Sequence, residues 1–172
     1  MKATKTWQVA LGGVLAAGSL AVLWLACVVP SGQLGVTAVA GLFPVGAVLA
    51  AGRGAGLLCW AAASILGLLL LPDKGVALMY LSFLGLYPVV KSRLEQLKSR
   101  TAEWAGKLVY FNAALTLLWF AFRGLFLPAL PEWMSAQVWV LYLAGNVIFI
   151  LYDIALSRLI GGLTARLRPK GM

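Results

Sequence analysis

Six long apolar stretches follow one another through this chain of 172 residues, and only short links separate them. A helix needs roughly 20 mostly apolar residues to cross about 30 Å of hydrocarbon. Hydrophobic side chains make up 62% of the sequence and charged ones 11%, too little polar surface to coat a water-soluble globule. We therefore expect an all-α polytopic membrane protein, a six-transmembrane-helix bundle forming a single membrane domain over residues 1–172. The expected spans lie at about residues 7–29, 33–52, 54–72, 75–94, 104–127 and 137–159.

The basic residues fall almost entirely on one side of the membrane when six crossings are assumed. Of the 14 Lys and Arg residues, only Lys74 and Arg123 fall on the other side. Cytoplasmic loops carry an excess of Lys and Arg, so we expect a multi-pass protein of the cell membrane with both termini in the cytoplasm. The formal net charge of +9 then reports orientation in the lipid bilayer, and no nucleic-acid partner is expected.

Side chains that carry most enzyme chemistry are scarce in this chain. It contains no histidine, which removes the commonest general base and the commonest metal ligand. Cys27 and Cys59 are expected at different depths in the membrane, too far apart for a disulfide, so both should be free thiols. No phosphate-binding loop motif occurs either. We therefore expect neither an enzyme nor a site for a cofactor or a metal.

One pentapeptide pattern occurs twice, as GLFPV at residues 41–45 and as GLYPV at residues 85–89. Each copy places a proline inside an apolar span, where the ring lacks an N–H and frees the carbonyl four residues back. The freed oxygens, those of Ala40 and Leu84, need protein or water donors because hydrocarbon supplies none. We expect structural kinks in two helices of the same direction, with ligand-facing breaks as the alternative. The flanking residues do not match, so the recurrence does not indicate a duplication.

The first span carries small residues along one face. Gly13, Ala17 and Ala21 follow one another at helical spacing, so this face is nearly devoid of side chains. Small residues let helices approach closely in lipid, where no hydrophobic force drives their association. The face is expected to pack either against a neighbouring helix of this chain or against another subunit.

Polar and aromatic side chains form one stripe on each of the last two spans. Two such stripes that meet beneath the outer surface would make a pocket, with rings for stacking, amides for orientation and a guanidinium for an anion. The alternative is structural: the asparagines join helices, and Trp139 lies in the interfacial aromatic belt. The stripes consist of Asn112, Thr116, Trp119 and Arg123 on the fifth span and of Trp139, Tyr142, Asn146 and Phe149 on the sixth.

Asp153 is the one carboxylate expected at bilayer depth. A carboxylate there costs free energy unless it is paired, which makes it a functional candidate. The alternative is a structural ion pair with Arg158, Lys91 or Arg93. The sequence leaves both interpretations open.

Three short segments are similar to features of one known family. Residues 17–21 (AGSLA) match an Ala-x-x-x-Ala face, residues 42–58 (LFPVGAVLAAGRGAGLL) a proline-containing second helix with a glycine-flanked turn, and residues 144–146 (AGN) a small-Gly-Asn opening. With its size, span count and cytoplasmic termini, the chain resembles the S component of an energy-coupling factor (ECF) transporter. That six-helix subunit captures vitamins and similar micronutrients at the bacterial inner membrane.

The resemblance implies a substrate-binding subunit that holds a vitamin-like small molecule in an outward-facing pocket, built mainly from the last three spans and the outer loops. Its partners would be a transmembrane coupling subunit, docked on the face of Gly13, Ala17 and Ala21, and cytoplasmic ATPase subunits. No motif identifies the substrate. The implied ligand contacts are Trp119, Arg123, Trp139, Tyr142 and Asn146, with Tyr80 from the fourth span and Gln33 from the first outer loop in addition.

Two other functions remain open for this sequence. A membrane accessory or assembly protein without a small ligand would use the same small-residue face. A small secondary transporter would be expected to consist of two inverted halves of three spans each, and residues 1–74 and 75–172 show no such symmetry.

Overall fold

The computed structural model of the chain describes residues 5–126 and 138–167, with the backbone alone for residues 121–126 and a few other positions. Every regular element in these ranges is a helix, so the expected all-α class is confirmed. The elements are α1 (Lys5–Val28), a 3₁₀ turn (Pro30–Gly32), α2 (Gln33–Ala40), α3 (Leu42–Ala51), α4 (Arg53–Leu70), α5 (Lys74–Met79), a π-helical turn (Tyr80–Leu84), α6 (Tyr87–Leu94), α7 (Arg100–Phe126) and α9 (Val138–Leu167).

Five helical segments of the described chain are long and apolar enough to cross a membrane, as expected of a membrane protein. The described part of α7 is not among them, so the sixth crossing stays a prediction. α9 continues to Leu167, beyond the expected end of the last span at residue 159. The five segments are Lys5–Val28, Gln33–Ala51, Arg53–Leu70, Lys74–Leu94 and Val138–Gly162.

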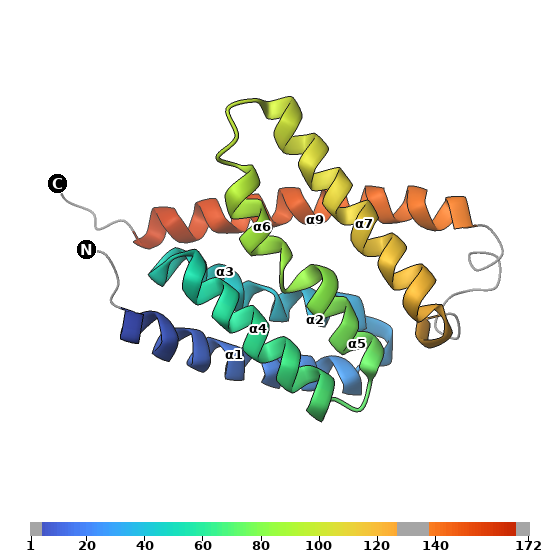
Figure 1. Cartoon of the computed structure of the whole chain (residues 1–172), viewed down its shortest axis with the longest axis horizontal. Coiled ribbons are helices and arrows are strands. Elements are labelled where there is room, and N and C mark those ends of the chain that lie inside the picture. Colours follow the sequence, from blue (N-terminus) through green and yellow to red (C-terminus); the bar gives the residue numbers. More distant parts are fainter. Residues whose placement is uncertain (1–4, 127–137, 168–172) are drawn as a thin grey trace.

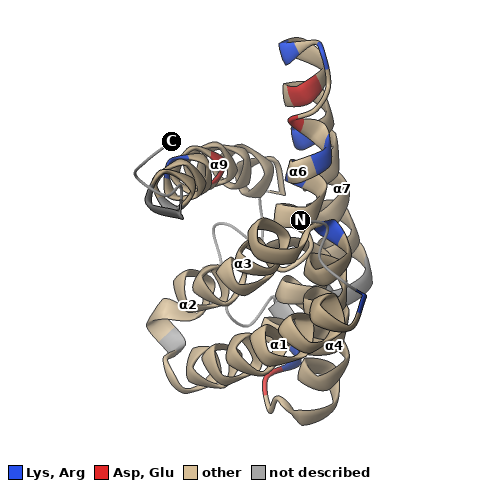
Figure 2. Ribbon diagram, turned by 90° about the vertical axis from the view of Figure 1, so that its left-hand side faces the viewer, with Lys and Arg blue, Asp and Glu red and all other residues tan. Residues whose placement is uncertain are grey.

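The helices form two groups. In the first, α1, α3 and α4 pack closely against one another, with α2 beside α1 and α5 beside α4. α6 lies between this group and α7. In the second, α7 and α9 cross each other, and α9 packs mainly against α7 (Figure 1). The start of α1, the turn between α3 and α4, and the end of α9 all lie at the same end of the molecule (Figure 1). Charged residues gather around the end of α6 and the start of α7 (Figure 2).

Small residues fill the core of the first group. Gly12 on α1 faces α4, where a Cβ on this residue would lie 3.2 Å from the carbonyl oxygen of Ala55 and 3.2 Å from Cβ of Leu58. Backbones can come this close only where side chains are absent or small. Cys59 lies buried in the same core, and both cysteines are free thiols, as expected. The buried members of this core are Ala16, Leu23, Ala26, Ala40, Ala47, Ala51, Ala55, Cys59, Ala63, Leu71, Val76, Ala77 and Tyr80.

The first proline motif separates α2 from α3 at Gly41. The carbonyl of Ala40, which Pro44 leaves without its helical donor, lies 3.0 Å from the hydroxyl of Ser19 on α1. That hydroxyl also lies 2.8 Å from the phenol oxygen of Tyr80. A serine has one proton to donate, so the consistent arrangement is that Tyr80 donates to Ser19 and Ser19 donates to Ala40. The expected donor for the freed carbonyl is therefore supplied by the protein.

The second proline motif follows the π-helical turn Tyr80–Leu84, where the N–H of Gly85 donates to the carbonyl of Tyr80 at 2.9 Å. Two carbonyls within this turn accept from side chains of other helices. Trp60 Nε1 donates to Leu81 at 3.0 Å, and Tyr110 Oη donates to Ser82 at 2.9 Å. Both prolines thus accompany interruptions of a helix where side chains donate to backbone carbonyls, while a donor for the carbonyl of Leu84 stays a prediction.

The two interruptions meet in the middle of the molecule. A Cβ on Gly41 would lie only 2.5 Å from the carbonyl oxygen of Leu84. Glycine is therefore required where the break between α2 and α3 crosses the end of the π-helical turn. The first residue of the GLFPV copy therefore packs against the π-helical turn that directly precedes the GLYPV copy.

Candidate functional site

The two predicted stripes meet between α7 and α9. The amide of Asn112 donates to the side-chain oxygen of Asn146 at 3.0 Å, and the amide of Asn146 donates back to Asn112 at 3.1 Å. Each amide also donates to the carbonyl four residues before it in its own helix, at 2.8 Å in both cases. The asparagines therefore join the two helices, which was the structural alternative, while contact with a ligand stays a prediction.

A second polar pair lies one turn from the asparagines, after Asn112 on α7 and before Asn146 on α9. The hydroxyls of Thr116 and Tyr142 are 2.6 Å apart. Thr116 Oγ1 also lies 2.7 Å from the carbonyl oxygen of Asn112 and donates to it, so Tyr142 is the donor to Thr116. With the asparagine pair, these four side chains form a polar ladder between two helices, which we call the α7–α9 ladder.

The aromatic and basic members of the stripes are placed differently from one another. Trp119 on α7 is buried, with 8% of its surface exposed. Trp139 at the start of α9 is 66% exposed, as an interfacial belt residue would be. The side chain of Arg123 lies outside the described residues, so its predicted contact with an anion is not placed.

Tyr80 and Gln33, the two additional predicted ligand contacts, lie away from the α7–α9 ladder. Tyr80 is fully buried in the small-residue core and hydrogen-bonded to Ser19. Gln33 donates to the carboxylate of Asp73 at 2.9 Å. That carboxylate also caps the start of α5 by accepting from the N–H of Gly75 at 2.8 Å. Both residues thus hold together segments of the first group of helices.

The small face of α1 is left uncovered by the residues that the structure describes. Gly13, Ala17 and Ala21 are all exposed, and a Cβ on Gly13 would meet nothing within 4 Å. The neighbouring positions Gly12 and Ala16 are the ones that pack against α4. The intramolecular contact and the exposed small face are therefore two different sides of α1.

Asp153 lies at the centre of a buried group of charges that links α6, α7 and α9. Its Oδ1 accepts from the ammonium of Lys91 and from the phenol of Tyr87, and its Oδ2 lies 3.1 Å from Nζ of Lys107. Asp153, Lys91 and Lys107 are each no more than 2% exposed. The expected pairing of Asp153 is confirmed for Lys91, whereas Arg93 and Arg158 are exposed.

The remaining partners complete this charge cluster. Lys91 Nζ lies 2.9 Å from Glu95 Oε1 and 2.7 Å from Ser157 Oγ, and Lys107 Nζ lies 2.6 Å from Glu103 Oε1. An ammonium has three protons, and each proton of Lys91 has an acceptor here. Buried charges persist only when they are paired in this way. The charge cluster therefore holds α6, α7 and α9 together.

Aromatic rings separate the charge cluster from the α7–α9 ladder. Phe111 and Phe149 stack at a centroid distance of 4.7 Å with an interplanar angle of 6°, one ring from each helix. Phe83 from the π-helical turn contacts both rings edge-on. This packing sets how α7 and α9 are rotated toward each other. The rings of the group are Phe83, Tyr87, Tyr110, Phe111, Phe149 and Tyr152.

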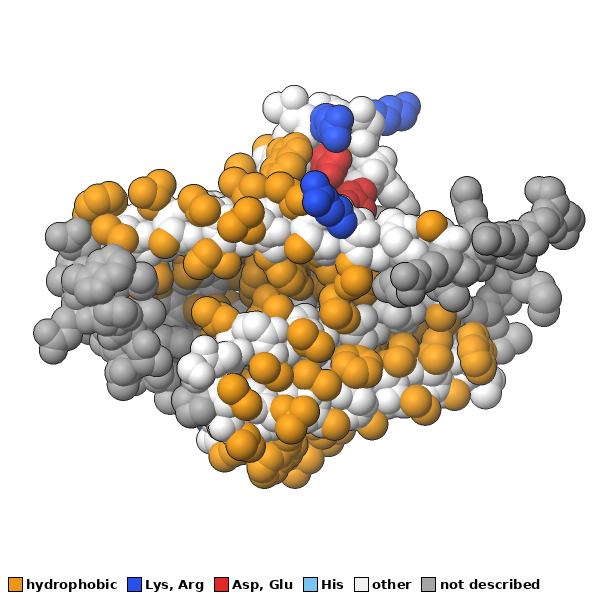
Figure 3. All heavy atoms as spheres, turned by 180° about the vertical axis from the view of Figure 1, so that it is seen from behind, with side chains coloured by type: hydrophobic (Ala, Val, Ile, Leu, Met, Phe, Trp, Pro, Cys, Tyr) orange, Lys and Arg blue, Asp and Glu red, His pale blue; other side chains and the backbone are white. Residues whose placement is uncertain are grey.

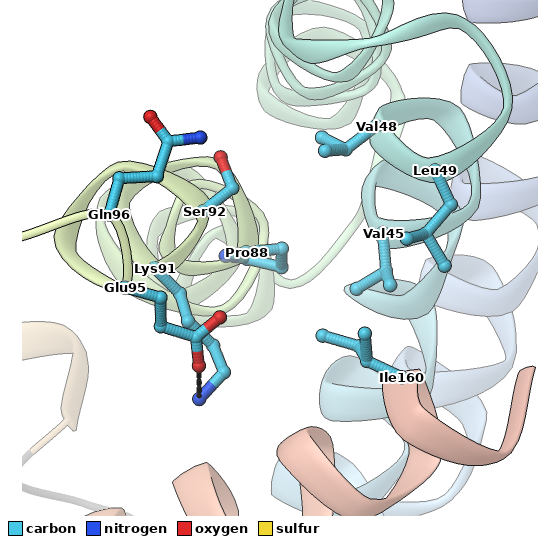
Figure 4. Close-up of a pocket in the computed structure, with 9 residues that line it drawn as sticks. All are labelled: Val45, Val48, Leu49, Pro88, Lys91, Ser92, Glu95, Gln96 and Ile160. Atoms are coloured by element: carbon cyan, nitrogen blue, oxygen red, sulfur yellow. Dashed lines mark ion pairs between the residues drawn. The ribbon is translucent and has the colours of Figure 1, made fainter. Parts of the chain in front are cut away.

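A cavity of about 240 Å³ lies between α3, α6 and α9, at the end of α3 that leads into α4. Val45, Val48 and Leu49 of α3 face Pro88 of α6 across it, and Ile160 of α9 closes one side (Figure 4). The polar lining comes from the last turn of α6 and the residues after it, namely Lys91, Ser92, Glu95 and Gln96. This cavity lies at the opposite end of α9 from the predicted outer pocket.

Sequence reasoning missed Lys107 as a partner of Asp153 and missed the cavity. A signal for the cluster was present, because Glu103 and Lys107 have the i, i+4 spacing of a helical ion pair. Tyr87, Lys91 and Glu95 likewise follow one another along one face of a helix. The cavity had no local signal, since its walls come from three separate helices.

A comparison of the chain with protein-family models, with characterised proteins and with solved structures finds no match to any of them.

Proposed function

We propose that this chain is the substrate-binding membrane subunit, or S component, of an ECF-type importer. It crosses the bacterial inner membrane six times with both termini in the cytoplasm. It captures a vitamin-like small molecule on the outer side, between α7 and α9. A transmembrane coupling subunit and ATPase subunits supply the energy for transport.

The observation that carries this proposal is the α7–α9 ladder. Polar side chains within membrane spans are costly, so a group of them is a candidate functional site. Here two amides and two hydroxyls lie one above the other between the same two helices, with buried Trp119 beyond them on α7. A small polar ligand that entered from the outside could exchange hydrogen bonds with these groups at low cost, because each bond it broke would be replaced.

The exposed small face of α1 supports the second half of the proposal, the dependence on a partner. A helix that leaves Gly13, Ala17 and Ala21 uncovered offers another transmembrane helix a site of close approach. Close packing of this kind is the main source of helix association in lipid. The coupling subunit is the partner we assign to this face.

A small secondary transporter fits the positions of the helix interruptions less well. In an inverted repeat of three plus three spans, the counterpart of the second span is the fifth. The second and fourth spans are interrupted here, at Gly41 and at the turn Tyr80–Leu84, whereas α7 is continuous from Arg100 to Phe126. The interruptions therefore do not follow such a repeat.

A membrane accessory protein without a small ligand is the second candidate. The observation in its favour is that the ladder is already satisfied, since each amide and each hydroxyl has a partner within the chain. An accessory protein would use the ladder only to hold α7 and α9 together. The two candidates differ in whether a small molecule binds.

Native mass spectrometry of the protein purified in mild detergent tests ligand capture. We expect a co-purifying small molecule on the wild-type protein and on the control Leu143→Ala, which trims an exposed side chain of α9. Asn146→Ala and Arg123→Ala should reduce its occupancy. If the wild-type protein carries no small molecule, and thiamine, riboflavin and biotin leave its thermal stability unchanged, the accessory function replaces the proposal.

Capture of partner subunits tests the small face of α1. Ala17→Leu should abolish co-purification of the ATPase subunits from bacterial membranes, because the larger side chain blocks close approach. Ala113→Leu makes the same change at an exposed position of α7 and should leave capture intact. Equal capture by both variants would remove the docking role of this face.

A further inference from the structure

The cavity between α3, α6 and α9 has walls of two kinds. Val45, Val48 and Leu49 on one side and Ile160 on the other are apolar, and they lie on helices long and apolar enough to cross the membrane. The polar lining is confined to the end of α6 and the residues that follow it. A site with one apolar part and one polar part suits an amphiphile.

Three residues of the apolar wall, Val48, Leu49 and Ile160, are partly exposed. Seen from behind, the surface is hollowed between α9 and the helices α2 and α3, and hydrophobic side chains line this hollow (Figure 3). α9 packs mainly against α7, so it leaves this side of α3 partly open. Water cannot fill a hydrocarbon-lined gap in a bilayer without losing its hydrogen bonds, whereas an acyl chain fills it at no such cost.

The polar end of the site has a guanidinium beside it. Arg53, the first residue of α4, donates from Nη2 to the carbonyl of Ser92 at 3.0 Å, and Ser92 lines the cavity. A guanidinium has five N–H donors in a planar fork, which suits a phosphate. Glu95, the acid in the cavity lining, is already paired with Lys91 at 2.9 Å. The remaining donors of Arg53 are thus not neutralised by the acid of the cavity lining.

The depth of the site matches one leaflet of the bilayer. The turn between α3 and α4 lies at the same end of the molecule as the start of α1 (Figure 1), which the distribution of basic residues assigns to the cytoplasm. The cytoplasmic leaflet is the one rich in anionic lipids, and basic residues near its surface attract them. The shape, polarity, charge and membrane depth of the cavity therefore all fit one class of molecule, an anionic amphiphile.

We propose that an anionic phospholipid of the cytoplasmic leaflet occupies this cavity, with one acyl chain between α3 and α9 and its phosphate on Arg53. The lipid fills the gap between the two groups of helices in the described part of the chain. The inference rests on the proposed orientation and is independent of ligand capture or transport.

Native mass spectrometry with defined lipids tests the site. Phosphatidylglycerol and phosphatidylcholine with identical acyl chains are titrated onto the delipidated protein, and the first bound lipid is quantified. We expect the wild-type protein to prefer phosphatidylglycerol by about fivefold, the effect of one basic residue at an anionic surface. Arg53→Gln should remove this preference, and Val48→Trp should remove tight binding of both lipids by filling the cavity.

Two matched controls separate a built site from diffuse attraction. Lys98→Gln removes an exposed charge in the segment that follows α6, and Val109→Trp adds an indole at an exposed position of α7. Both should bind lipid as the wild-type protein does. Equal loss on Lys98→Gln and Arg53→Gln would overturn the site in favour of general surface charge.

Other outcomes are equally decisive. If Val48→Trp leaves lipid binding unchanged but abolishes capture of a partner protein, the cavity is a protein-docking site and the proposal is wrong. Thermal unfolding of each variant in lipid-free detergent identifies a variant that fails to fold. For such a case Arg53→Ala, which also removes the guanidinium, and Ile160→Trp, which fills the cavity from α9, provide independent readouts. A phosphatidylglycerol preference unchanged on Arg53→Ala, together with tight lipid binding unchanged on Ile160→Trp, would also overturn the site.

Discussion

The two groups of helices in this protein are held together by opposite means. Where α1, α3 and α4 meet, the core consists largely of alanine, with glycine at the closest approaches, and backbones lie in near contact. Where α6, α7 and α9 meet, large rings and paired charges fill the space. In a bilayer both solutions work, because neither needs the hydrophobic effect to bring helices together.

The difference matters for what each group can do. Close packing of small residues gains many weak dispersion contacts and tolerates almost no displacement, since every contact depends on distance. Hydrogen bonds and ion pairs of the second group are few and directional, and a ligand or a second set of partners can replace them. The first group is suited to be a rigid body and a docking surface, and the second to be the part that responds.

The largest expected effect comes from the charge cluster. Asp153→Ala leaves Lys91 and Lys107 buried without their shared counter-ion, and removing one partner of a buried pair costs about 3–5 kcal/mol. The free energy of unfolding in detergent should fall by that amount, as measured from denaturant titrations followed by tryptophan fluorescence. The control Glu95→Gln alters a side chain that is 39% exposed and should cost about 1 kcal/mol or less. Equal losses of stability in Asp153→Ala and Glu95→Gln would mean that water reaches the charge cluster.

The second effect tests the small-residue group. Gly41→Ala places a Cβ 2.5 Å from the carbonyl oxygen of Leu84, which only a backbone shift can relieve, and such overpacking costs about 1–3 kcal/mol. Gly13→Ala is the matched control, because a Cβ there meets nothing within 4 Å. That variant should be neutral or more stable by about 0.5–1 kcal/mol, since alanine favours the helix. If Gly41→Ala leaves the free energy of unfolding unchanged, the two helix interruptions are not in close contact.

The third effect concerns the serine that serves both interruptions. Ser19→Ala leaves the carbonyl of Ala40 without its donor and the phenol of Tyr80 without its acceptor. An unmade hydrogen bond at a buried group costs about 1–3 kcal/mol. Tyr80→Phe removes only the second contact and should cost less than Ser19→Ala in the same unfolding measurement. The reverse order would mean that Ala40 has another donor.

The sequence predicted this first group better than the second. Apolar length and turn residues located the helices, so that α1 at Lys5–Val28 is close to the expected 7–29. Proline chemistry also predicted that the carbonyl of Ala40 needs a donor. The identity of that donor could not be read from the sequence, because Ser19 comes from a helix whose rotation depends on the packing of Gly12 and Ala16.

For the second group, the sequence predicted which polar residues matter but not which of them contact one another. Helical spacing placed Asn146 and Asn112 on facing stripes, yet it could not distinguish groups that bind a ligand from groups that bind each other. The partners of Asp153 depend on how α6 and α7 are rotated, and aromatic rings far apart in the sequence fix that rotation. Lys107 was therefore not predicted from the sequence as a member of the charge cluster, although its i, i+4 spacing from Glu103 was visible.

The smallest expected effect decides whether the α7–α9 ladder is a clamp or an exchangeable set of contacts. A double-mutant cycle on Asn112→Leu and Asn146→Leu measures the coupling between the two amides in the unfolding free energy. Hydrogen bonds between membrane helices average about 0.6 kcal/mol in such cycles, and we expect a coupling of that size here. A clamp would instead show a coupling of about 2 kcal/mol or more, beyond the range found for such bonds. Weak coupling beside a costly Asp153→Ala means that the helices are locked at the charge cluster and free to part at the ladder, as a subunit that admits a ligand from one side requires.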